Sequence, residues 1–237
     1  MNRPHLTTKK ETPARSTQLS LEQYDSDKIS GGYLERYDPV FEPWVDKPIT
    51  LLELGVYKGG SLLLWHDYFP VGQIVGIDIN PPREFKANDR IRFFEGSQTD
   101  IAFLSKVAGE TAPDGFDIII DDASHVGELT KISFWHLFEK NLKPGGLYVI
   151  EDWGTGYWGH WSDGKDFNPE SYSRPQSQFW AKVRRRLHLK RPMRGHNYGM
   201  VGFIKQLIDE QGFRGRFEKI MIVPAIVFIY KKESPHA

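Results

Sequence analysis

The chain has 237 residues, which is enough for one domain with a full hydrophobic core and a site. Its 31 Lys and Arg residues balance 31 Asp and Glu residues, so net charge gives no argument for binding nucleic acid or an anionic membrane. Because it contains no cysteine, disulfides, thiolate metal sites and cysteine nucleophiles are excluded.

The N-terminal part of the sequence is polar. Residues 1–18 contain proline and lack hydrophobic periodicity, which predicts a disordered tail before a domain over residues 19–237. No apolar run approaches the roughly 20 residues of a membrane span, and the first residues lack the apolar stretch of a secretory signal. We therefore expect a cytoplasmic protein without a membrane span.

Short apolar segments alternate with helical patterns along the middle of the chain. Strands are predicted at 50–56, 73–79, 91–96, 116–121 and 146–152. Helices are predicted at 60–69, 100–109, 128–142, about 178–190 and 201–211. The alternation is typical of an α/β fold, a parallel sheet covered by helices on both faces. Two last apolar segments, 216–223 and 225–232, flank Pro224 and predict a hairpin whose final strand is antiparallel to the rest.

The predicted strands end in polar and acidic residues. In chain order the five ends read ELGVYKGGS, GIDIN, FEGSQTD, IIDDASH and VIEDW. A closed core would not tolerate these side chains. In parallel sheets, ligands bind outside the carboxyl ends of the strands, near the point where the strand order reverses. We therefore expect the five strand ends to form one site.

The turn after the first strand combines glycines with a helix start. Gly55 and Gly59 let the backbone approach a ligand and leave amide donors free. Asp78, at the end of the second strand, is suited to bind the two hydroxyls of a ribose. The spacing G-x-x-x-G-G, and Glu53, whose carboxylate would repel a pyrophosphate, favour a sulfonium cofactor over a nicotinamide dinucleotide. The alternative is an acidic cap on a tight turn.

Acidic residues end the fourth and fifth strands. Asp122 follows one of them, and Glu151 and Asp152 end the other. On neighbouring strands these carboxylates would repel each other unless a cation lay between them. Oxygen ligands without sulfur favour Mg²⁺, with Mn²⁺ or Ca²⁺ as alternatives, over zinc. A helix cap at Asp122, with arginine partners for the other two residues, is the non-metal alternative.

His125 lies three residues after Asp122, close enough to serve the same site. Methyl transfer to an alcohol requires the hydroxyl proton to leave. A divalent cation lowers the pKa of a hydroxyl, and a histidine can accept its proton. His125 is therefore a candidate general base, and its alternative role is a helix-start residue bonded to a neighbouring carbonyl.

Taken in order, ELGVYKGGS, GIDIN, GSQTD, IDDASH and VIED resemble the motifs of class I S-adenosylmethionine-dependent methyltransferases. They resemble more closely the metal-dependent O-methyltransferases of macrolide sugars and of actinobacterial glycans. The stretch SDKISGGYLERYDPVF at 26–41 is similar to an N-terminal segment of the same group. The resemblance covers roughly residues 25–155. It implies a single Rossmann-like domain with a seven-stranded sheet, an entrance or lid segment at 19–48, and an aromatic and basic insertion at 153–195 near the acceptor.

The resemblance also implies roles for individual residues. Around S-adenosylmethionine it implies Glu53, Gly55, Gly59, Ser61, Asp78, Gln98 and Asp121. Within this set the first four hold the methionine part, Asp78 the ribose, and Gln98 and Asp121 the adenine. It implies Asp122, Glu151 and Asp152 as metal ligands and His125 as the base. The motif GVYKGG departs from the G-x-G of many methyltransferases, so the backbone contacts to the cofactor do not carry over.

An aromatic stretch follows the fifth strand directly. Its candidate substrate residues are Trp153, Tyr157, Trp158, His160 and Trp161. Aromatic faces stack on pyranose rings and on bases. Their position favours a small-molecule or oligosaccharide acceptor, and a self-packed loop or a dimer contact is the alternative. The aromatic surface and the N-terminal arm also make us expect a homodimer.

The run KVRRRLHLKRPMRG at 182–195 holds seven cations in fourteen residues. It predicts a solvated helix face, with an anionic partner such as RNA as the alternative. The NPP at 80–82 follows the second strand, whereas methyltransferases of amino groups carry such a motif after the fourth. No nucleic-acid partner is therefore expected.

These observations predict a Mg²⁺- and S-adenosylmethionine-dependent O-methyltransferase of a sugar or glycoside hydroxyl. The preferred acceptor is a mannoside in methylmannose polysaccharide synthesis. Four alternatives stay open: methylation of a macrolide-type sugar, RNA methylation, a nicotinamide-dependent oxidoreductase, and a protein that binds the cofactor without transferring its methyl group.

Overall fold

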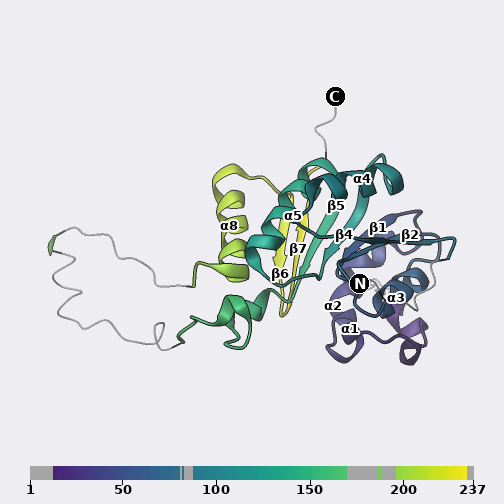
Figure 1. The fold of residues 1–237 in the computed structure, drawn as a ribbon, viewed down its shortest axis with the longest axis horizontal. Coiled ribbons are helices and arrows are strands. Elements are labelled where there is room, and N and C mark those ends of the chain that lie inside the picture. Colours follow the sequence, from purple (N-terminus) through teal and green to yellow (C-terminus); the bar gives the residue numbers. More distant parts are fainter. Residues whose placement is uncertain (1–12, 81, 83–87, 170–185, 188–195, 234–237) are drawn as a thin grey trace, which may run out of the picture.

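A seven-stranded sheet crosses the middle of the molecule (Figure 1). The computed structural model describes residues 13–80, 82, 88–169, 186–187 and 196–233. The strands are β1 (Thr50–Leu54), β2 (Gln73–Asp78), β3 (Ile91–Glu95), β4 (Phe116–Asp121), β5 (Leu142–Glu151), β6 (Lys219–Ile222) and β7 (Ile226–Tyr230). Their order is β3-β2-β1-β4-β5-β7-β6, with β1 to β5 parallel and β7 antiparallel to both neighbours. The predicted α/β sheet with an antiparallel last strand is confirmed.

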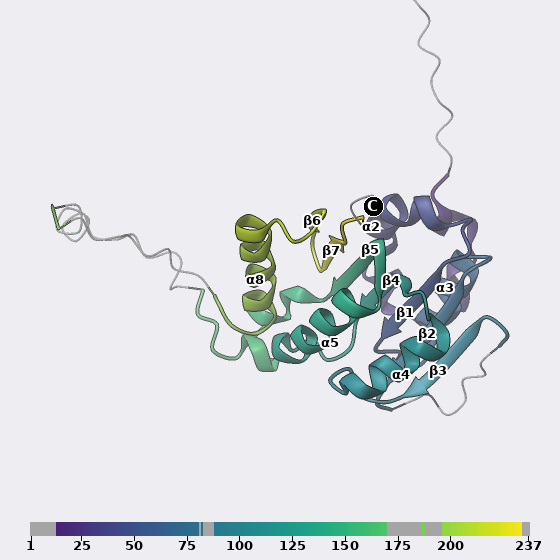
Figure 2. The same cartoon turned by 90° about the horizontal axis from the view of Figure 1, so that it is seen from above.

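Helices cover both faces of the sheet. The helices are α1 (Asp27–Ser30), α2 (Leu34–Phe41), α3 (Gly60–Tyr68), α4 (Ile101–Thr111), α5 (Gly127–Lys140) and α8 (Gly199–Arg214). Short 3-10 turns are η1 (Arg15–Gln18), η2 (Leu21–Gln23), η3 (Glu42–Trp44), η4 (Trp153–Tyr157) and η5 (Ser162–Gly164). Seen from above, α2 and α3 lie on one side of the sheet and α4, α5 and α8 on the other (Figure 2).

Each face of the sheet has its own hydrophobic cluster because successive strand side chains point to opposite faces. Ile118 of β4 packs in the cluster with Tyr37 and Trp65, under α2 and α3. Ile119, the next residue, packs in the cluster with Phe134 and Phe203, under α5 and α8. The central strands are buried on both sides, which explains why they read as continuous apolar runs.

The order of the sheet reverses between β1 and β4, since β2 lies beyond β1 and β5 beyond β4. Ligands of open α/β sheets bind at such a point, outside the carboxyl ends of the strands. Residues 55–61, 121–125 and 151–153 follow these carboxyl ends. The fold therefore brings together the strand ends that the sequence singled out.

The structure differs from the sequence prediction at the N-terminus. Residues 13–18 were expected to be disordered, but η1 packs against the domain, while residues 1–12 lie outside the described part. Arg15 donates through Nε to the carbonyl oxygen of Tyr68 at 3.0 Å and through Nη2 to that of Asp67 at 2.5 Å. The Ser16 hydroxyl donates to Asp38 at 2.5 Å. These contacts are polar and reach distant backbone, so hydrophobic periodicity carries no sign of them.

The fifth strand begins earlier than predicted. Residues 143–145, which lie between the predicted helix and the predicted strand, belong to β5, where the register against β4 shifts between Phe116 and Ile118. Gly145 has a φ of +74°, which an L side chain rarely adopts. The irregular pairing explains why the sequence pattern places the start of the strand too late. The predicted helix at about 178–190 and the basic run at 182–195 lie outside the described residues, apart from 186 and 187.

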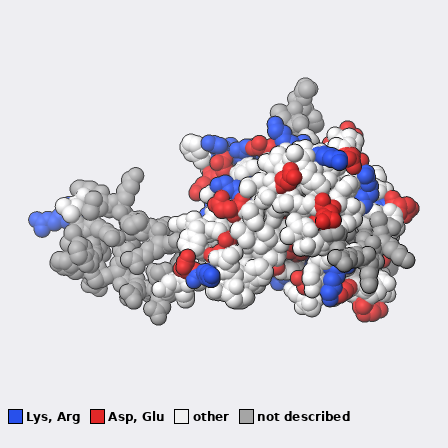
Figure 3. Space-filling view, in the orientation of Figure 1, with Lys and Arg blue, Asp and Glu red and all other residues white. Residues whose placement is uncertain are grey.

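None of the helices in the described part of the chain is long and apolar enough to cross a membrane. On the face drawn in Figure 3, Lys and Arg side chains alternate with Asp and Glu side chains around a broad area of other residues. This face therefore carries no continuous basic patch among its described residues.

Asp163, in η5, joins the N-termini of two helices. Its Oδ2 accepts hydrogen bonds from the backbone N–H of Gly127 at 2.8 Å and of Met200 at 2.7 Å. Gly127 begins α5, and Met200 is the second residue of α8. A carboxylate at a helix N-terminus satisfies free amide donors and opposes the helix dipole.

We expect Asp163→Ala to lower the free energy of unfolding by about 2–3 kcal/mol, since two charge-assisted hydrogen bonds are lost. Asp166→Ala is the matched control, because this nearby aspartate is exposed and its loss should change stability by less than about 0.5 kcal/mol. Urea denaturation of the three proteins measures the difference. Equal stability of the two variants would contradict a joining role for Asp163.

Candidate functional site

The turn after β1 is tightly packed against the end of β4. Gly55 has a φ of +86°, and a Cβ atom there would lie 2.1 Å from the carbonyl oxygen of Asp122. Any other residue would push the two strand ends apart. Asp78 fixes the same turn, because its Oδ2 accepts from the backbone N–H of Val56 at 2.8 Å and of Tyr57 at 3.0 Å.

A cavity of about 790 Å³ opens over this turn. Its walls come from residues 25–28, from the β1 turn with Ser61, from Asp78 at the end of β2, and from Asp122 and His125 after β4. A smaller cavity of about 170 Å³ shares Gly55 and Asp78 with it and is lined further by Gln98. The backbone of Asp25 lies close over the turn, since a Cβ at Gly60 would lie 2.0 Å from the carbonyl oxygen of Asp25.

Glu53 lies behind the larger cavity and is fully buried. Its carboxylate accepts hydrogen bonds from the Ser61 hydroxyl at 2.7 Å and from Trp65 Nε1 at 3.2 Å, and it lies 3.4 Å from Lys28 Nζ. Burial raises the pKa of Glu53. Of these four residues, Ser61 and Lys28 line the cavity itself.

Gln98 and Asp121 form a buried network next to the smaller cavity. Gln98 lines that cavity and donates to Asp121 at 3.2 Å. Asp121 also accepts from the hydroxyls of Ser133 at 2.7 Å and Tyr148 at 3.0 Å. Asp121 lines neither of these two cavities, and its place near the adenine stays a prediction. Its side chain is positioned to hold Gln98 from behind.

Asp121 should make stability fall as pH rises through the mildly acidic range. Burial raises the pKa of Asp121 to about 6, whereas an aspartate in an unfolded chain has a pKa of about 3.9. The folded protein therefore binds more protons than the unfolded chain in this window, and ionisation of Asp121 costs roughly 1–3 kcal/mol by the time the pH exceeds 6.

Asp121→Asn tests this expectation, because an amide cannot ionise. Between pH 4 and about pH 6.5 the free energy of unfolding of the variant, relative to wild type, should rise by roughly 1–3 kcal/mol. Urea denaturation at several pH values, without added metal, measures it. A difference between the two proteins that does not vary with pH would count against a raised pKa.

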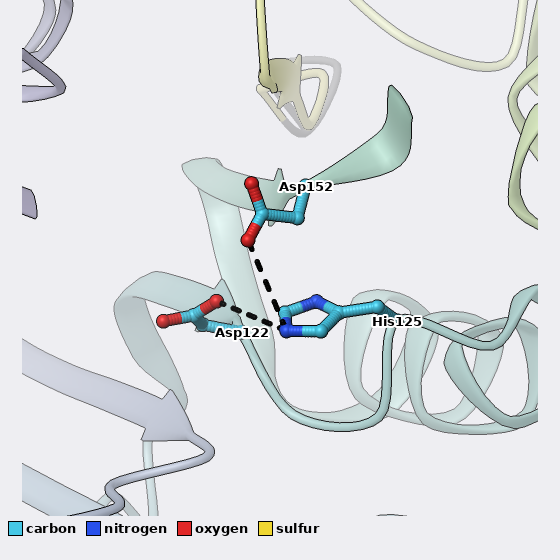
Figure 4. Close-up of side chains that lie close together, drawn as sticks. All are labelled: Asp122, His125 and Asp152. Carbon is cyan, nitrogen blue, oxygen red and sulfur yellow. Dashed lines mark ion pairs between the residues drawn. The ribbon is translucent and has the colours of Figure 1, made fainter. Parts of the chain in front are cut away.

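Three side chains converge at the mouth of the sheet beside the cavity (Figure 4). His125 Nε2 lies 3.9 Å from Asp122 Oδ1 and 3.9 Å from Asp152 Oδ2. One potential ligand atom from each residue lies within 4.8 Å of the others. His125 and Asp152 both have a φ of +51°, a left-handed conformation that is uncommon for such residues and is concentrated at functional sites.

The three residues fit a divalent cation. Their candidate ligand atoms lie within 4.8 Å of one another, close enough for one divalent cation to contact them, since Mg²⁺ binds oxygen at about 2.0–2.1 Å and Ca²⁺ at about 2.3–2.6 Å. Burial raises the pKa of Asp122. A cation between the carboxylates would compensate for their mutual repulsion. Mg²⁺ commonly binds through one or two carboxylates and leaves its other positions to water or substrate, so Asp122 and Asp152 suffice to hold it.

Glu151, the third predicted metal ligand, is not part of this group. It is fully buried, its Oε2 accepts from Lys28 Nζ at 3.0 Å, and its Oε1 accepts from the Tyr37 hydroxyl. Both oxygens are therefore engaged by the protein. Burial and the charge of Asp122 raise the pKa of Glu151 well above its usual range. The side chain that lies beside Asp122 and Asp152 in the structure is His125 and not Glu151.

The sequence prediction missed the residues that hold these carboxylates. Lys28 is 1% exposed, and its Nζ lies 2.6 Å from Asp122 Oδ2 as well as near Glu151 and Glu53. Burial alone would lower the pKa of Lys28, but the three carboxylates raise it well above its usual value. The Tyr33 hydroxyl donates to Asp152 Oδ1. The stretch at 26–41 gave the only sign of them, as a similarity without a role.

The aromatic stretch after β5 divides into two parts. The Trp161 ring packs edge to face on His125, with centroids 5.2 Å apart, and Trp158 and His160 are exposed and stack at 5.9 Å. Trp153 instead donates through Nε1 to the carbonyl oxygen of Val223 at 3.0 Å. The Tyr157 ring packs on Phe167 at 4.9 Å. The first three residues lie toward or outside the site, and the last two pack within the protein.

No protein-family model matches the chain. Among curated proteins, mycinamicin VI 2''-O-methyltransferase of Micromonospora griseorubida is 42% identical over 133 residues, which are 53% of this chain and 32% of that protein. An O-methyltransferase of Streptomyces olivaceus that acts on 8-demethyl-8-(2-methoxy-alpha-L-rhamnosyl)-tetracenomycin-C is 43% identical over 128 residues, 51% of this chain and 32% of that protein.

Solved structures give the same direction. MycE methyltransferase from the mycinamycin biosynthetic pathway, in complex with Mg, SAH and mycinamycin VI, superposes with a TM-score of 0.68 at 31% identity, over 94% of this chain and 56% of that chain. The chain has the class I methyltransferase fold. A putative ribosomal RNA methyltransferase of Plasmodium falciparum, at 17% identity and a TM-score of 0.51 over 89% of this chain and 98% of that chain, shares this fold alone.

The similarity covers only part of the length of each of these relatives. The chain spans about a third of the two curated relatives and 56% of the MycE chain. The curated relatives are named as O-methyltransferases of mycinamicin VI and of a rhamnosyl tetracenomycin. Of the two groups that the sequence resembles, the comparisons therefore support the natural-product group, and they give no support to the mannoside that the sequence reasoning preferred.

Proposed function

We propose that the chain is an S-adenosylmethionine- and Mg²⁺-dependent O-methyltransferase that acts on a sugar hydroxyl of a polyketide-type glycoside. The observation that carries the proposal is the convergence of Asp122, His125 and Asp152 beside the cavity over the β1 turn. An acidic pair suited to a hard cation lies within reach of one titratable imidazole. This combination suits the activation of an alcohol as a nucleophile, and the names of the relatives favour methyl transfer over hydride transfer.

The donor binds in the two connected cavities under this proposal. Gly55, Gly59 and Ser61 surround the methionine part, Asp78 accepts from the ribose hydroxyls, and Gln98 lies by the adenine. Glu53 supplies negative charge behind the sulfonium, although three protein groups already contact it. Asp121 acts on the adenine through Gln98.

The acceptor hydroxyl lies at the point shared by Asp122, His125 and Asp152. Asp122 and Asp152 would hold a divalent cation, which when bound would lower the pKa of that hydroxyl. His125 Nε2 accepts its proton as the oxygen attacks the methyl carbon. The new O–C bond forms while the C–S bond breaks, so the products are the methyl ether and S-adenosylhomocysteine. Trp161, packed on His125, offers a face for the sugar ring.

The acceptor class is favoured by the names of the relatives, since mycinamycin VI is bound in one MycE structure. Trp158 and His160 are exposed beside Trp161 and extend the surface that an acceptor would meet. The 19–48 segment acts as a lid over the donor. A homodimer stays a prediction.

Transfer of labelled methyl groups from S-adenosylmethionine tests the proposal. The panel holds macrolide glycosides, tetracenomycin-type rhamnosides, mannosides and RNA, each with Mg²⁺ or with EDTA. We expect label on a polyketide glycoside, lost in EDTA and recovered with excess Mg²⁺. Label found only on mannosides, or only on RNA, would show that the acceptor is not a polyketide glycoside. Tight cofactor binding without transfer to any acceptor would indicate a binding protein, and NADH binding would favour an oxidoreductase.

A further inference from the structure

In each carboxylate of the proposed metal site, one oxygen faces His125 and the other is bonded to a residue of the N-terminal part of the chain. Asp122 turns Oδ1 toward His125 Nε2, at 3.9 Å, and its Oδ2 accepts from Lys28 Nζ at 2.6 Å. Asp152 turns Oδ2 toward the same nitrogen, at 3.9 Å, and its Oδ1 accepts from the Tyr33 hydroxyl. One oxygen of each residue faces the shared point, and the other is held from behind.

Both groups that hold these rear oxygens come from one short piece of chain. Lys28 lies in α1, and Tyr33 immediately precedes α2. Tyr37, one turn into α2, donates to Glu151. Residues 26–41, called here the N-terminal segment, therefore contact Asp122, Glu151 and Asp152. The segment also forms one wall of the donor cavity through Ser26, Asp27 and Lys28.

Lys28 compensates the negative charge of three carboxylates that lie around its ammonium group. Its Nζ lies within 3.4 Å of oxygens from Glu53, Asp122 and Glu151, and its side chain is 1% exposed. Carboxylates brought this close out of water repel one another strongly. A fixed ammonium among them lets the ligands be held in place before any cation binds. The ammonium also bonds to Glu151, whereas Asp122 and Asp152 each keep one oxygen toward His125.

We infer that Lys28 and Tyr33 are positioning residues that fix the metal-binding oxygens of Asp122 and Asp152 from behind. The inference rests on the proposed function, since it concerns the same metal site. Groups that hydrogen-bond to metal ligands orient them, and loss of such a group typically weakens metal binding by about 10–100-fold. The N-terminal segment therefore acts on the metal as well as covering the donor.

Tyr33→Phe is the decisive variant, because it removes one hydroxyl and keeps the ring. Mn²⁺ binding to the whole chain, followed by the loss of the free-ion signal in electron paramagnetic resonance, should weaken by about 10–100-fold. Raised metal concentration should restore methyl transfer, which a defect of folding alone would not allow. Unchanged Mn²⁺ affinity in Tyr33→Phe would overturn the assignment of Tyr33.

Tyr24→Phe is the matched control. Tyr24 precedes the N-terminal segment, is buried to nearly the same degree as Tyr33 (6% and 8% exposed), and donates its hydroxyl to Asp67 at 2.7 Å, away from the cluster. We expect its loss to lower the melting temperature about as much as Tyr33→Phe does, with Mn²⁺ affinity unchanged. Equal weakening of Mn²⁺ binding in both variants would mean that the effect is one of general stability, and the inference would fail.

Lys28→Met tests the second residue through stability. Without the ammonium, the carboxylates are uncompensated and less well held, so the variant should melt well below wild type in EDTA and gain less stability from a given Mn²⁺ concentration than wild type does. A melting curve identical to wild type in EDTA would remove Lys28 from the inference. These measurements need no acceptor: a wild-type chain that binds no Mn²⁺ would overturn the proposed function itself, whereas one that binds it equally well as Tyr33→Phe overturns the inference alone.

Discussion

Under the proposed function, replacing Asp122 by asparagine should lower methyl transfer by about 10²–10³-fold or more, since loss of a proposed metal ligand would remove several kcal/mol of charge stabilisation. Asparagine keeps the shape of the side chain but loses the charge. It also leaves Lys28 Nζ, 2.6 Å from Asp122 Oδ2 in the wild type, without its nearest counter-charge. Steady-state assays with labelled S-adenosylmethionine over a range of Mg²⁺ concentrations measure the loss.

Asp117→Asn is the control for this variant. Asp117 lies on the same strand, near its opposite end, and accepts from the backbone N–H of Thr50 at 2.8 Å and from Lys143 Nζ at 2.9 Å. Its replacement should reduce stability and leave the catalytic rate close to wild type. Treatment of the wild-type enzyme with EDTA should reproduce the Asp122→Asn defect, and added Mg²⁺ should reverse it. Full turnover by Asp122→Asn or by the metal-stripped wild type would remove the metal from the mechanism.

The location of the site could be predicted from the sequence because strand ends are visible there. The apolar run before Asp121 and Asp122 has to be buried, and the acidic residues after it do not fit a closed core. Parallel strands carry their carboxyl ends to the same edge, so the ends of β1, β2, β4 and β5 meet without any knowledge of side-chain contacts. The hairpin that closes the sheet followed in the same way from Pro224.

The partners of the acidic residues could not be predicted in this way. Lys28 contacts Asp122 across 94 positions of sequence and Glu151 across 123, and it lies in a helix of four residues with no amphipathic pattern. A lysine in a short helix without an apolar pattern normally indicates solvent exposure. Only the three buried carboxylates around it explain why it is 1% exposed, and their convergence is a property of the folded sheet.

The distinction between Glu151 and Asp152 shows a second limit. Both follow the same strand, and the sequence gives them the same chemistry. Glu151 ends β5 in regular extended backbone and points into the cluster of Tyr37 and Lys28. At Asp152 the chain enters the left-handed region, with a φ of +51°, and the side chain turns toward His125. This local backbone conformation separates the two roles, and no residue type or spacing signals it.

Replacing His125 by alanine should lower kcat by about 10²–10⁴-fold, the usual contribution of a general base. The imidazole Nε2 faces Asp122 and Asp152, and within the described part of the chain its buried Nδ1 makes no hydrogen bond. The affinity for S-adenosylhomocysteine should change little. His136→Ala is the control, since His136 bonds to Ser105 on the outer surface between α4 and α5.

Metal affinity decides between the two chemical roles that the geometry allows His125. As a base, it leaves the cation to Asp122 and Asp152, so calorimetric titration of His125→Ala with Mn²⁺ should give an affinity near that of wild type. As a ligand, its loss should weaken binding about as much as Asp122→Asn does, and raised Mn²⁺ should restore turnover. Since Mg²⁺ binds imidazole poorly and is satisfied by one or two carboxylates with water, we expect the first result. A rate defect that metal rescues would reassign His125 from proton acceptor to ligand.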